Sequence, residues 1–433
     1  MTLPASVSAL RQIFMFWLPL AASWLLMGAE VPVLQAAIAR LANMETQLAA
    51  FGIVMSLEIA IESPVIMLLA TSTALSTSAC NYLTLRRFMI WINSMATVAA
   101  VLLAYTPLYD FIVRFLMHIP SNIADAAQPG MKIMILWTAA IGLRRFYQGV
   151  MIRSGKTRSI GYGTAARLLG SGGTGILLAL LSGLPGVHVG SIALMAGVLT
   201  EAGFIAWAVR PTVRRVLANR EEGKQQYTML DVLRYHAPLA ATSLLTLLAQ
   251  PVVGAGLARM PNPGENLAAW PVVWGIVFLF RSPSFALPEA VIALVSERRL
   301  KDAVRIFCRR IGIACSLAML LFAASPLSGL YLRHIAGLPE NLSRFVMPAV
   351  ALALPLPFIN SIHSRLRGLL MAAHSTKVIY LGMGLNLAAT ALLILLGALL
   401  KAPGAQTAVV AFTAAFILEI LFLRKAGRTA LAS

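Results

Sequence analysis

The tetrapeptide Pro19-Leu20-Ala21-Ala22 decides the fold, because it recurs as Pro238-Leu239-Ala240-Ala241, 219 residues further along the chain. The same offset, without a gap, pairs several more segments. These are Pro32 with Pro251, Ala39-Arg40 with Ala258-Arg259, Asn43 with Asn262, Leu48-Ala49-Ala50 with Leu267-Ala268-Ala269, Ser63-Pro64 with Ser282-Pro283, and Arg86 with Arg305. Residues 19–88 match their counterparts at 23 of 70 positions, which indicates an internal duplication.

The composition places both copies in a membrane. Of the 433 residues, 59% are hydrophobic and 12% are charged, whereas soluble domains carry about 25% charged residues. A helix of about 20 apolar residues spans a bilayer, and by that measure the sequence predicts twelve spans. They are 12–39, 47–79, 88–107, 131–153, 159–183, 188–210, 232–258, 267–296, 306–325, 345–372, 378–400 and 405–424.

The duplication predicts how these spans are arranged. Each copy holds six spans, and an even number preserves direction, so the copies are parallel repeats of the kind found in transporters. We therefore expect an all-α polytopic membrane protein whose two pseudo-symmetric six-helix halves surround a central cleft. The halves are predicted at 1–210 and 232–433, joined by a cytoplasmic linker at 211–231.

Basic residues predict the orientation of the chain. Lys and Arg are concentrated in the loops that follow even-numbered spans, so both termini are expected in the cytoplasm. The residues concerned are Arg86, Arg87, Arg153, Lys156, Arg158, Arg214, Arg215, Arg220, Lys224, Arg298, Arg299, Lys301 and Lys377. Short loops and bare tails favour a bacterial inner membrane. Candidate kinks are Pro32, Pro64, Pro251, Pro283 and Pro288, since proline removes a backbone donor.

Three acidic residues lie inside predicted spans, where a charge needs a partner, water or a function. Glu30 is in the first span, and Glu58 and Glu62 are one helical turn apart on one face of the second. Two neighbouring carboxylates repel, which favours proton uptake by one of them. We expect Glu62, Glu30 and Glu58 to couple transport to an ion or to gate the cleft. The alternative is that they pair with arginines from other spans.

Basic residues inside spans predict an anion site. Arg144 and Arg145 lie in the fourth span, His363 and Arg365 in the tenth, and Arg281 occupies the repeat position of Glu62. Because guanidinium forks bind phosphate and carboxylate, these five are the predicted substrate-binding residues. The alternatives are a static Glu62–Arg281 salt bridge and arginines that reach the membrane surface. The more solitary charges are expected to pair between helices: Arg167, Glu201 and Glu419.

Motifs for other chemistries do not occur in the sequence. There is no Walker motif, no Gly-rich dinucleotide loop and no metal-like His/Asp cluster, so we predict neither an enzyme nor a cofactor. Gly170-Ser171-Gly172-Gly173 is interpreted as a close-packing patch. The expected partners are a small anionic substrate, a coupling ion (proton or sodium) and membrane lipids, with no nucleic acid, and the expected state is a monomer.

Two segments resemble the MOP superfamily, which includes MATE multidrug exporters and flippases of lipid-linked precursors. Ala39-Arg40-Leu41 through Phe51-Gly52 resembles the stretch that joins the first two MATE helices, and Gly149 through Arg158 resembles their turn between the fourth and fifth. Since the MATE proton-binding acid lies in the first helix, the resemblance implies a coupling role for Glu30.

A closer resemblance is to the progressive ankylosis (ANKH-type) branch. The residues that carry it are Pro19-Leu20, Glu30, Ala50-Phe51-Gly52, Ser56-Leu57, Tyr105-Thr106-Pro107-Leu108-Tyr109, Ile112, His118, Pro355-Leu356-Pro357, His363, Gly368-Leu369-Leu370-Met371 and Lys377. That branch is associated with export of pyrophosphate, nucleotide or citrate-like anions, so the resemblance implies an anionic substrate.

The leading hypothesis is therefore a secondary exporter of a small polyvalent anion that works by alternating access and is coupled to an ion. One alternative is a MATE-like proton- or sodium-coupled antiporter of organic cations, with the acidic residues at the substrate. Another is a flippase of a phosphorylated lipid, which also needs arginines.

Overall fold

A computed structural model describes residues 5–154, 156, 158–218, 226–294, 300–373 and 375–428. Part of the predicted linker, 219–225 with Arg220 and Lys224, lies outside the described residues, as do Thr157, Arg298 and Arg299. The described chain is helical throughout, and it divides into two compact units. The contiguous unit is Ala37–Ala255, and the discontinuous unit combines Met1–Ala36 with Gly256–Ser433.

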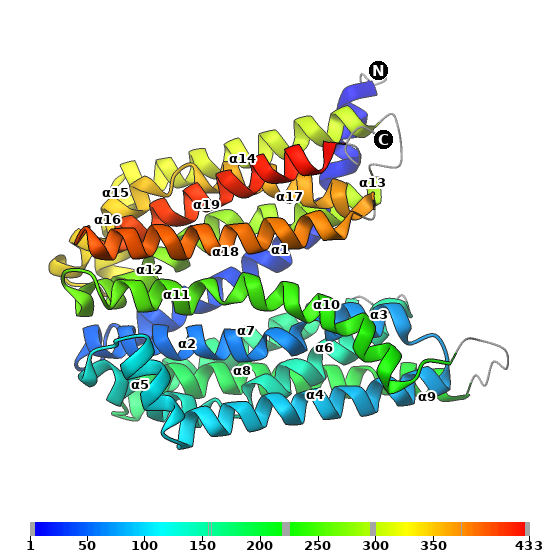
Figure 1. Cartoon of the computed structure of the whole chain (residues 1–433), viewed down its shortest axis with the longest axis horizontal. Helices are drawn as coiled ribbons and strands as arrows, with labels where there is room; N and C mark the ends of the chain where they lie inside the picture. The colour runs from blue at the N-terminus through cyan, green and yellow to red at the C-terminus, as the bar shows by residue number, and fades with distance from the viewer. Residues whose placement is uncertain are drawn as a thin grey trace. The chain divides into compact units, whose positions relative to one another are not determined.

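Each unit is a bundle of antiparallel helices (Figure 1). The contiguous unit contains α2 (Met44–Ile66), α3 (Leu68–Leu75), α4 (Ala79–Tyr105), η1 (Asp110–Leu116), α5 (Ser121–Ile133), α6 (Trp137–Arg153), α7 (Arg158–Leu181), α8 (Gly186–Ala208), α9 (Arg210–Ala218), α10 (Met229–Leu247) and most of α11 (Ala249–Leu257). The discontinuous unit contains α1 (Ala5–Ile38), α12 (Pro263–Arg281), η2 (Ser282–Ala286), α13 (Leu287–Leu294), α14 (Lys301–Ala324), α15 (Pro326–Leu330), η4 (Tyr331–Ile335), α16 (Glu340–Leu352), α17 (Leu356–Ala372), α18 (Thr376–Leu399) and α19 (Gly404–Ala426).

The internal repeat is visible in the backbone. Helices α5 and α6 begin and end 219 residues before α16 and α17, and α2 begins 219 residues before α12. Asn43 and Asn262, which precede α2 and α12, both adopt the left-handed conformation, with φ of 53° and 55°. Because non-glycine residues rarely take positive φ, the same strained cap at equivalent positions confirms the duplication.

Ten described helices are long and apolar enough to cross a membrane, and the bent pair α16–α17 makes eleven. The chain is thus a multi-span integral membrane protein. The fourth predicted span, 131–153, begins near the end of α5 and continues through the 17 residues of α6. Its repeat counterpart, α16–α17, bends by 47° at residues 353–355. Hydropathy missed the first break because its residues are apolar, whereas the second contains Pro355, a helix-breaking residue that was not among the candidate kinks.

Prolines interrupt several spans, as predicted. Helix α2 ends two residues after Pro64, and α12 gives way to the short 3-10 turn η2 at Ser282-Pro283. Helix α10 ends at Leu247 and α11 resumes at Ala249, before Pro251. Pro32, in contrast, lies within α1, which runs unbroken.

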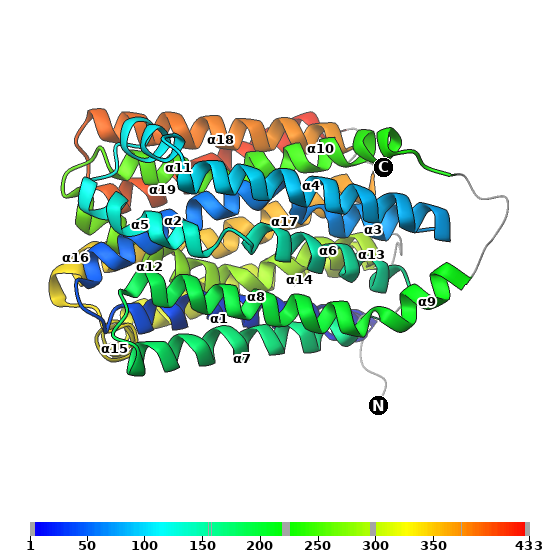
Figure 2. The same cartoon turned by 90° about the horizontal axis from the view of Figure 1, so that it is seen from below.

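The first helix of each repeat packs against the opposite repeat (Figure 1, Figure 2). In α1, Trp17 Nε1 donates a hydrogen bond to the carbonyl oxygen of Pro283, at 3.0 Å. In α10, the repeat counterpart His236 donates from Nε2 to the carbonyl oxygen of Pro64, at 2.8 Å. Both bonds satisfy a carbonyl at the broken second helix of the opposite repeat. Each compact unit therefore contains the first helix of the other repeat. The predicted boundaries 1–210, 211–231 and 232–433 divide the chain by sequence repeat and not by packing, and they stay a prediction.

The predicted close-packing patch joins α7 to α8 through two of its residues. A Cβ atom on Gly170 would lie 3.0 Å from Thr200 Oγ1 and 3.3 Å from the Gly197 backbone, and one on Gly197 would lie 2.7 Å from Ser171. Cβ atoms on Gly172 and Gly173 would meet nothing within 4 Å. Close packing is therefore confirmed for the first two residues of the patch only.

Gly149 is the tightest contact between α6 and α3, and we expect Gly149→Ala to destabilise the protein. Its Cβ would lie 1.9 Å from Ser72 Oγ and 2.5 Å from the Leu69 carbonyl oxygen. Overpacking of this kind costs about 1–3 kcal/mol. Gly161→Ala is the matched control, since a Cβ there meets nothing within 4 Å and alanine favours the helix. Thermal unfolding in detergent should separate the two variants, and equal stability would contradict the close approach.

Candidate functional site

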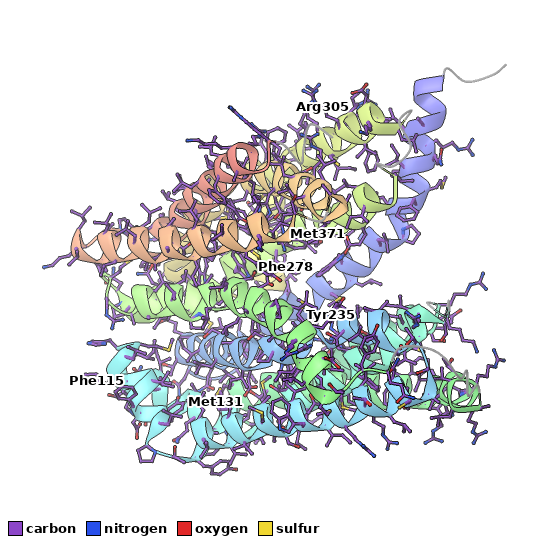
Figure 3. The ribbon with its side chains drawn as sticks, turned by 45° about the vertical axis from the view of Figure 1, so that its right-hand side comes forward. Phe115, Met131, Tyr235, Phe278, Arg305 and Met371 are labelled. Carbon is purple, nitrogen blue, oxygen red and sulfur yellow. The ribbon has the colours of Figure 1, made fainter. Side chains whose placement is uncertain are left out.

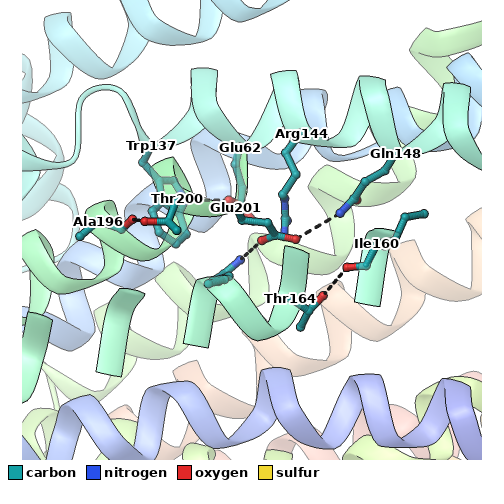
Figure 4. Close-up of polar contacts among 10 residues, drawn as sticks. Glu62, Trp137, Arg144, Gln148, Ile160, Thr164, Ala196, Thr200 and Glu201 are labelled. Atoms are coloured by element: carbon teal, nitrogen blue, oxygen red, sulfur yellow. Dashed lines mark hydrogen bonds and ion pairs between the residues drawn. The ribbon is translucent and has the colours of Figure 1, made fainter. Parts of the chain in front are cut away.

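A buried polar cluster in the contiguous unit is centred on Glu201 of α8, which is 0% exposed (Figure 4). One of its carboxylate oxygens accepts a hydrogen bond from Arg144 Nη1 at 2.5 Å and lies 3.8 Å from Arg167 Nη1. The other accepts from Gln148 Nε2 at 3.2 Å. Helices α6, α7 and α8 thus meet at one carboxylate. We call these four residues the Glu201 cluster.

Glu62 joins this cluster through an indole. Trp137 Nε1 at the start of α6 donates a hydrogen bond to Glu62 Oε2 at 2.7 Å. The Arg167 guanidinium lies 5.5 Å from the centroid of the Trp137 ring, within range of a cation–π interaction. The predicted gating residue Glu62 is therefore held inside its own unit, where the indole contacts both it and a member of the Glu201 cluster.

Glu58 is in a different situation, one helical turn before Glu62. It is 0% exposed, and neither of its carboxylate oxygens has a hydrogen-bond partner among the described residues. A buried ionised carboxylate without a partner is very costly, whereas a protonated carboxyl costs far less. The surroundings of Glu58 therefore favour its carboxyl group with a proton or another cation bound.

The discontinuous unit carries a second buried cluster, centred on Arg281 at the end of α12. The side chain is 3% exposed, and Nη2 donates to Asn360 Oδ1 at 2.9 Å. Aromatic rings surround the guanidinium, with Cζ 4.9 Å from the Phe416 centroid, 5.3 Å from Trp274 and 5.6 Å from Phe285.

The Arg281 guanidinium lacks an acidic partner. No carboxylate in the described parts of the chain forms an ion pair with it, and Nε and Nη1 have no hydrogen-bond partner there. Buried charges are ordinarily paired, so this cation is an exception. Its environment of rings and one amide leaves two guanidinium nitrogens without a hydrogen-bond partner in the described chain.

Beside it, His363 and Glu419 repeat the geometry of the Glu201 cluster. His363 Nε2 lies 2.7 Å from Glu419 Oε1, and Asn386 Nδ2 donates to Glu419 Oε2 at 2.9 Å. His363 is the repeat counterpart of Arg144, and its ring packs edge-on against Phe416, 5.1 Å between centroids. The two units therefore hold the same kind of three-helix contact, with a carboxylate from α8 or α19 as the acceptor.

Comparison with solved structures identifies the architecture. The eukaryotic MATE transporter AtDTX14 superposes with a TM-score of 0.67 at 13% identity, covering 99% of each chain. A MOP-superfamily transporter from Pyrococcus furiosus gives 0.67 at 14% identity, covering 100% of this chain and 99% of that one. The chain has the MATE fold. The lipid II flippase MurJ, in an inward closed conformation, also gives 0.67, at 13% identity over 94% of this chain and 87% of that one. No protein-family model and no curated protein sequence matches the chain.

Within the MATE fold, the predicted site residues divide between the two units. Arg144, Arg145, Glu58 and Glu62 are in the contiguous unit, while Arg281, His363, Arg365 and Glu30 are in the discontinuous unit. Glu30 is buried in α1, the exchanged helix, so it is not in the unit that holds Glu58 and Glu62. Arg365 lines a cavity with three other arginines, and Arg281 is not part of that lining.

The sequence predicted some members of the two buried clusters and missed others. Glu201 and Glu419 were expected to pair between helices, and the ion pair of Glu201 with Arg144 and the hydrogen bond between Glu419 and His363 confirm this. The residues that sequence reasoning missed are uncharged: Trp137, Gln148, Asn360 and Asn386. An indole or an amide in an apolar span carries no charge, so hydropathy alone does not reveal it. The one signal available was the repeat, in which Asn386 stands at the position equivalent to Arg167.

Proposed function

We propose that the chain is a secondary transporter that moves a small polyvalent anion by alternating access, coupled to an ion. The observation that carries this proposal is the buried Arg281 guanidinium, which has aromatic neighbours, one amide partner and no acidic partner in the described chain. A pyrophosphate, nucleotide or citrate-like anion would supply the missing negative charge. It would also accept the hydrogen bonds that Nε and Nη1 can donate.

Energetics support an anion more than a cation at this position. A charge in a bilayer centre costs about 2.5–3.5 kcal/mol on insertion scales, and more where it lacks a partner. Cation–π contacts return about 2 kcal/mol in a desolvated site. A bound anion would offset the remainder, whereas a cation would add repulsion. His363 is proposed to assist, but it already contacts a carboxylate, so Arg281 is the residue that distinguishes the site.

Two of the structural neighbours are compatible with this substrate class. The Pyrococcus furiosus transporter is described as having a binding pocket of reverse polarity that suggests a different function, and MurJ is described as a lipid II flippase. We further propose that the chain belongs to the progressive ankylosis branch, which its sequence resembles. A bacterial inner membrane, cytoplasmic termini and a monomeric state belong to the same proposal.

A second candidate function, antiport of organic cations, is favoured by the partnerless carboxyl of Glu58. One experiment separates the two. Purified protein in liposomes is supplied with labelled citrate, pyrophosphate or ATP, and a proton gradient is imposed. We expect gradient-dependent flux of at least one anion. Absence of anion flux, together with gradient-dependent movement of a cationic dye, would replace the anion proposal with the cation antiporter.

Glu58 is proposed to carry the coupling proton, because its buried carboxyl lacks a hydrogen-bond partner in the described chain. In Glu58→Gln we expect uphill, gradient-driven anion movement to fall at least about tenfold, while downhill exchange continues, since an amide cannot exchange the proton. Glu45→Gln, at the start of the same helix, is the control and should leave both unchanged. The measurement compares uphill and downhill flux in liposomes; unaltered uphill flux in Glu58→Gln would remove Glu58 from the coupling step.

A further inference from the structure

A cavity lined by arginines lies between α14, α17 and α19 of the discontinuous unit. Its volume is about 150 Å³, and its arginines are Arg305 and Arg309 from α14, Arg365 from α17 and Arg424 from α19. The buried residues Cys308 and Ser361 are also part of its lining. The Ser361 hydroxyl donates to the Cys308 carbonyl, which ties α17 to α14 beside the cavity.

None of the described residues that line this cavity is a carboxylate. Asp302 lines an adjoining cavity of about 240 Å³ together with Arg305 and Arg309. Arg365, which is half-buried, and Arg424 line only the first cavity. Four guanidinium groups around one space repel one another in the absence of a counter-charge, so the lining is suited to an anion with several oxygens.

The internal repeat provides a comparison for this arginine set. In the first copy, Ile90 and Phe146 stand at the positions of Arg309 and Arg365 at the offset of 219, and Ala206 stands at the position of Arg424 when the starts of α8 and α19 are matched. Only Arg305 has a basic counterpart, Arg86. Charges that merely set orientation are expected at the same helix ends in both parallel copies. Arg309, Arg365 and Arg424 therefore stand at positions that carry no basic residue in the first copy.

The surface next to the cavity is apolar. On α14, Ile313 and Leu317 follow Arg309 at intervals of four residues, so they share its face, and they are 42% and 51% exposed. On α19, Leu421 lies one turn before Arg424 and is 56% exposed. Helix α14 begins, and α19 ends, at the end of the unit where α1 begins (Figure 1), and Figure 3 labels Arg305 there. A cationic cavity at the end of an apolar helix face matches a phospholipid, which has a phosphate above its acyl chains.

We propose that this cavity binds the headgroup phosphate of an anionic phospholipid, with its acyl chains along the exposed faces of α14 and α19. Guanidinium forks hold phosphate oxygens through paired charge-assisted hydrogen bonds. Basic pockets between membrane helices bind such headgroups on the cytoplasmic side, the side predicted for this end of the chain. A zwitterionic lipid brings an ammonium group towards four cations, so the site discriminates against it. This site is separate from Arg281 and does not depend on the transported anion.

The experiment is native mass spectrometry of the purified full chain titrated with phosphatidylglycerol or phosphatidylcholine. The test variant, Arg309→Ile with Arg365→Phe, carries the residues of the first repeat. We expect its affinity for phosphatidylglycerol to fall at least about tenfold, with phosphatidylcholine unaffected. Arg310→Ile is the matched control, because it is exposed, follows Arg309 directly and does not line the cavity. Arg424→Ala, at an exposed position, should weaken binding about threefold or more and carries little risk of misfolding.

Two results would overturn the proposal. In the first, Arg424→Ala and the double variant both bind phosphatidylglycerol with the same affinity as Arg310→Ile. The second is displacement of phosphatidylglycerol from the wild-type protein by an equal concentration of inorganic phosphate, which would make this a site for a free anion.

Discussion

Arg281→Ala is expected to abolish anion transport, lowering the initial rate at least about 100-fold. The guanidinium can donate two further charge-assisted hydrogen bonds, from Nε and Nη1, and hydrogen bonds to charged groups contribute about 1.5–3 kcal/mol each. Losing two of them removes at least about 3 kcal/mol of substrate binding, which corresponds to about two orders of magnitude. Arg281→Lys keeps the charge but not the fork, so partial activity is expected.

Asn360→Asp tests the same idea without altering the arginine. Asn360 Oδ1 already accepts from Arg281 at 2.9 Å, so an aspartate there would give the guanidinium an internal counter-ion. With its charge balanced by the aspartate, Arg281 no longer attracts an anion. The loss of flux is therefore expected to be comparable to that in Arg281→Ala, although the protein is folded. Rates are measured as initial uptake of labelled anion into liposomes at matched protein content. Wild-type rates in both Arg281→Ala and Asn360→Asp would exclude the cluster as the substrate site.

Arg144→Ala is expected to destabilise the folded protein by about 3–5 kcal/mol, because it leaves the fully buried Glu201 carboxylate without its nearest cation. Arg167, at 3.8 Å, and Gln148 remain but do not replace a 2.5 Å ion pair. Arg144→His should recover part of the loss. The second repeat already holds a histidine at this position, 2.7 Å from Glu419, so the backbone geometry accepts that pairing.

Arg114 supplies the control for this comparison. It bridges Asp110 and Asp125, whose side chains are 61% and 67% exposed, and surface pairs contribute about 0–1 kcal/mol. Unfolding in detergent, followed by tryptophan fluorescence, should therefore show a much larger loss for Arg144→Ala than for Arg114→Ala. Equal losses would mean that water reaches Glu201 and screens the buried pair.

The sequence predicted the fold well because the membrane imposes a strong constraint on it. Apolar runs revealed the helices, and the offset of 219 revealed the repeat that α5–α6 and α16–α17 reproduce in the backbone. Pairing of Glu201 and Glu419 was also predictable, since a buried charge requires a partner. Which side chain becomes that partner was not, because it depends on how neighbouring helices are rotated about their axes.

The exchange of first helices explains the main difficulty with the site. Glu30, Glu58 and Glu62 are close in sequence, yet α1 and α2 belong to different compact units. Nothing in hydropathy distinguishes a first helix that packs on its own repeat from one that packs on the other. Trp17 and His236 did carry a signal: each is a polar donor in the first helix, at equivalent repeat positions. A salt bridge between Glu62 and Arg281 stays a prediction.

The same exchange has a consequence for biosynthesis. The contiguous unit is complete once residue 255 has left the ribosome, whereas α1, which is made before that unit, packs against helices encoded from residue 256 onward. Helix α1 must therefore reside in the lipid bilayer without its final neighbours while the elements from α2 to α11 are inserted and begin to pack. Many of its apolar side chains are exposed and it carries few charges, so it is suited to a lipid environment before its partner helices are inserted. Order of synthesis and order of assembly are thus different in this chain, since α1 is made before the contiguous unit and completes its packing after it.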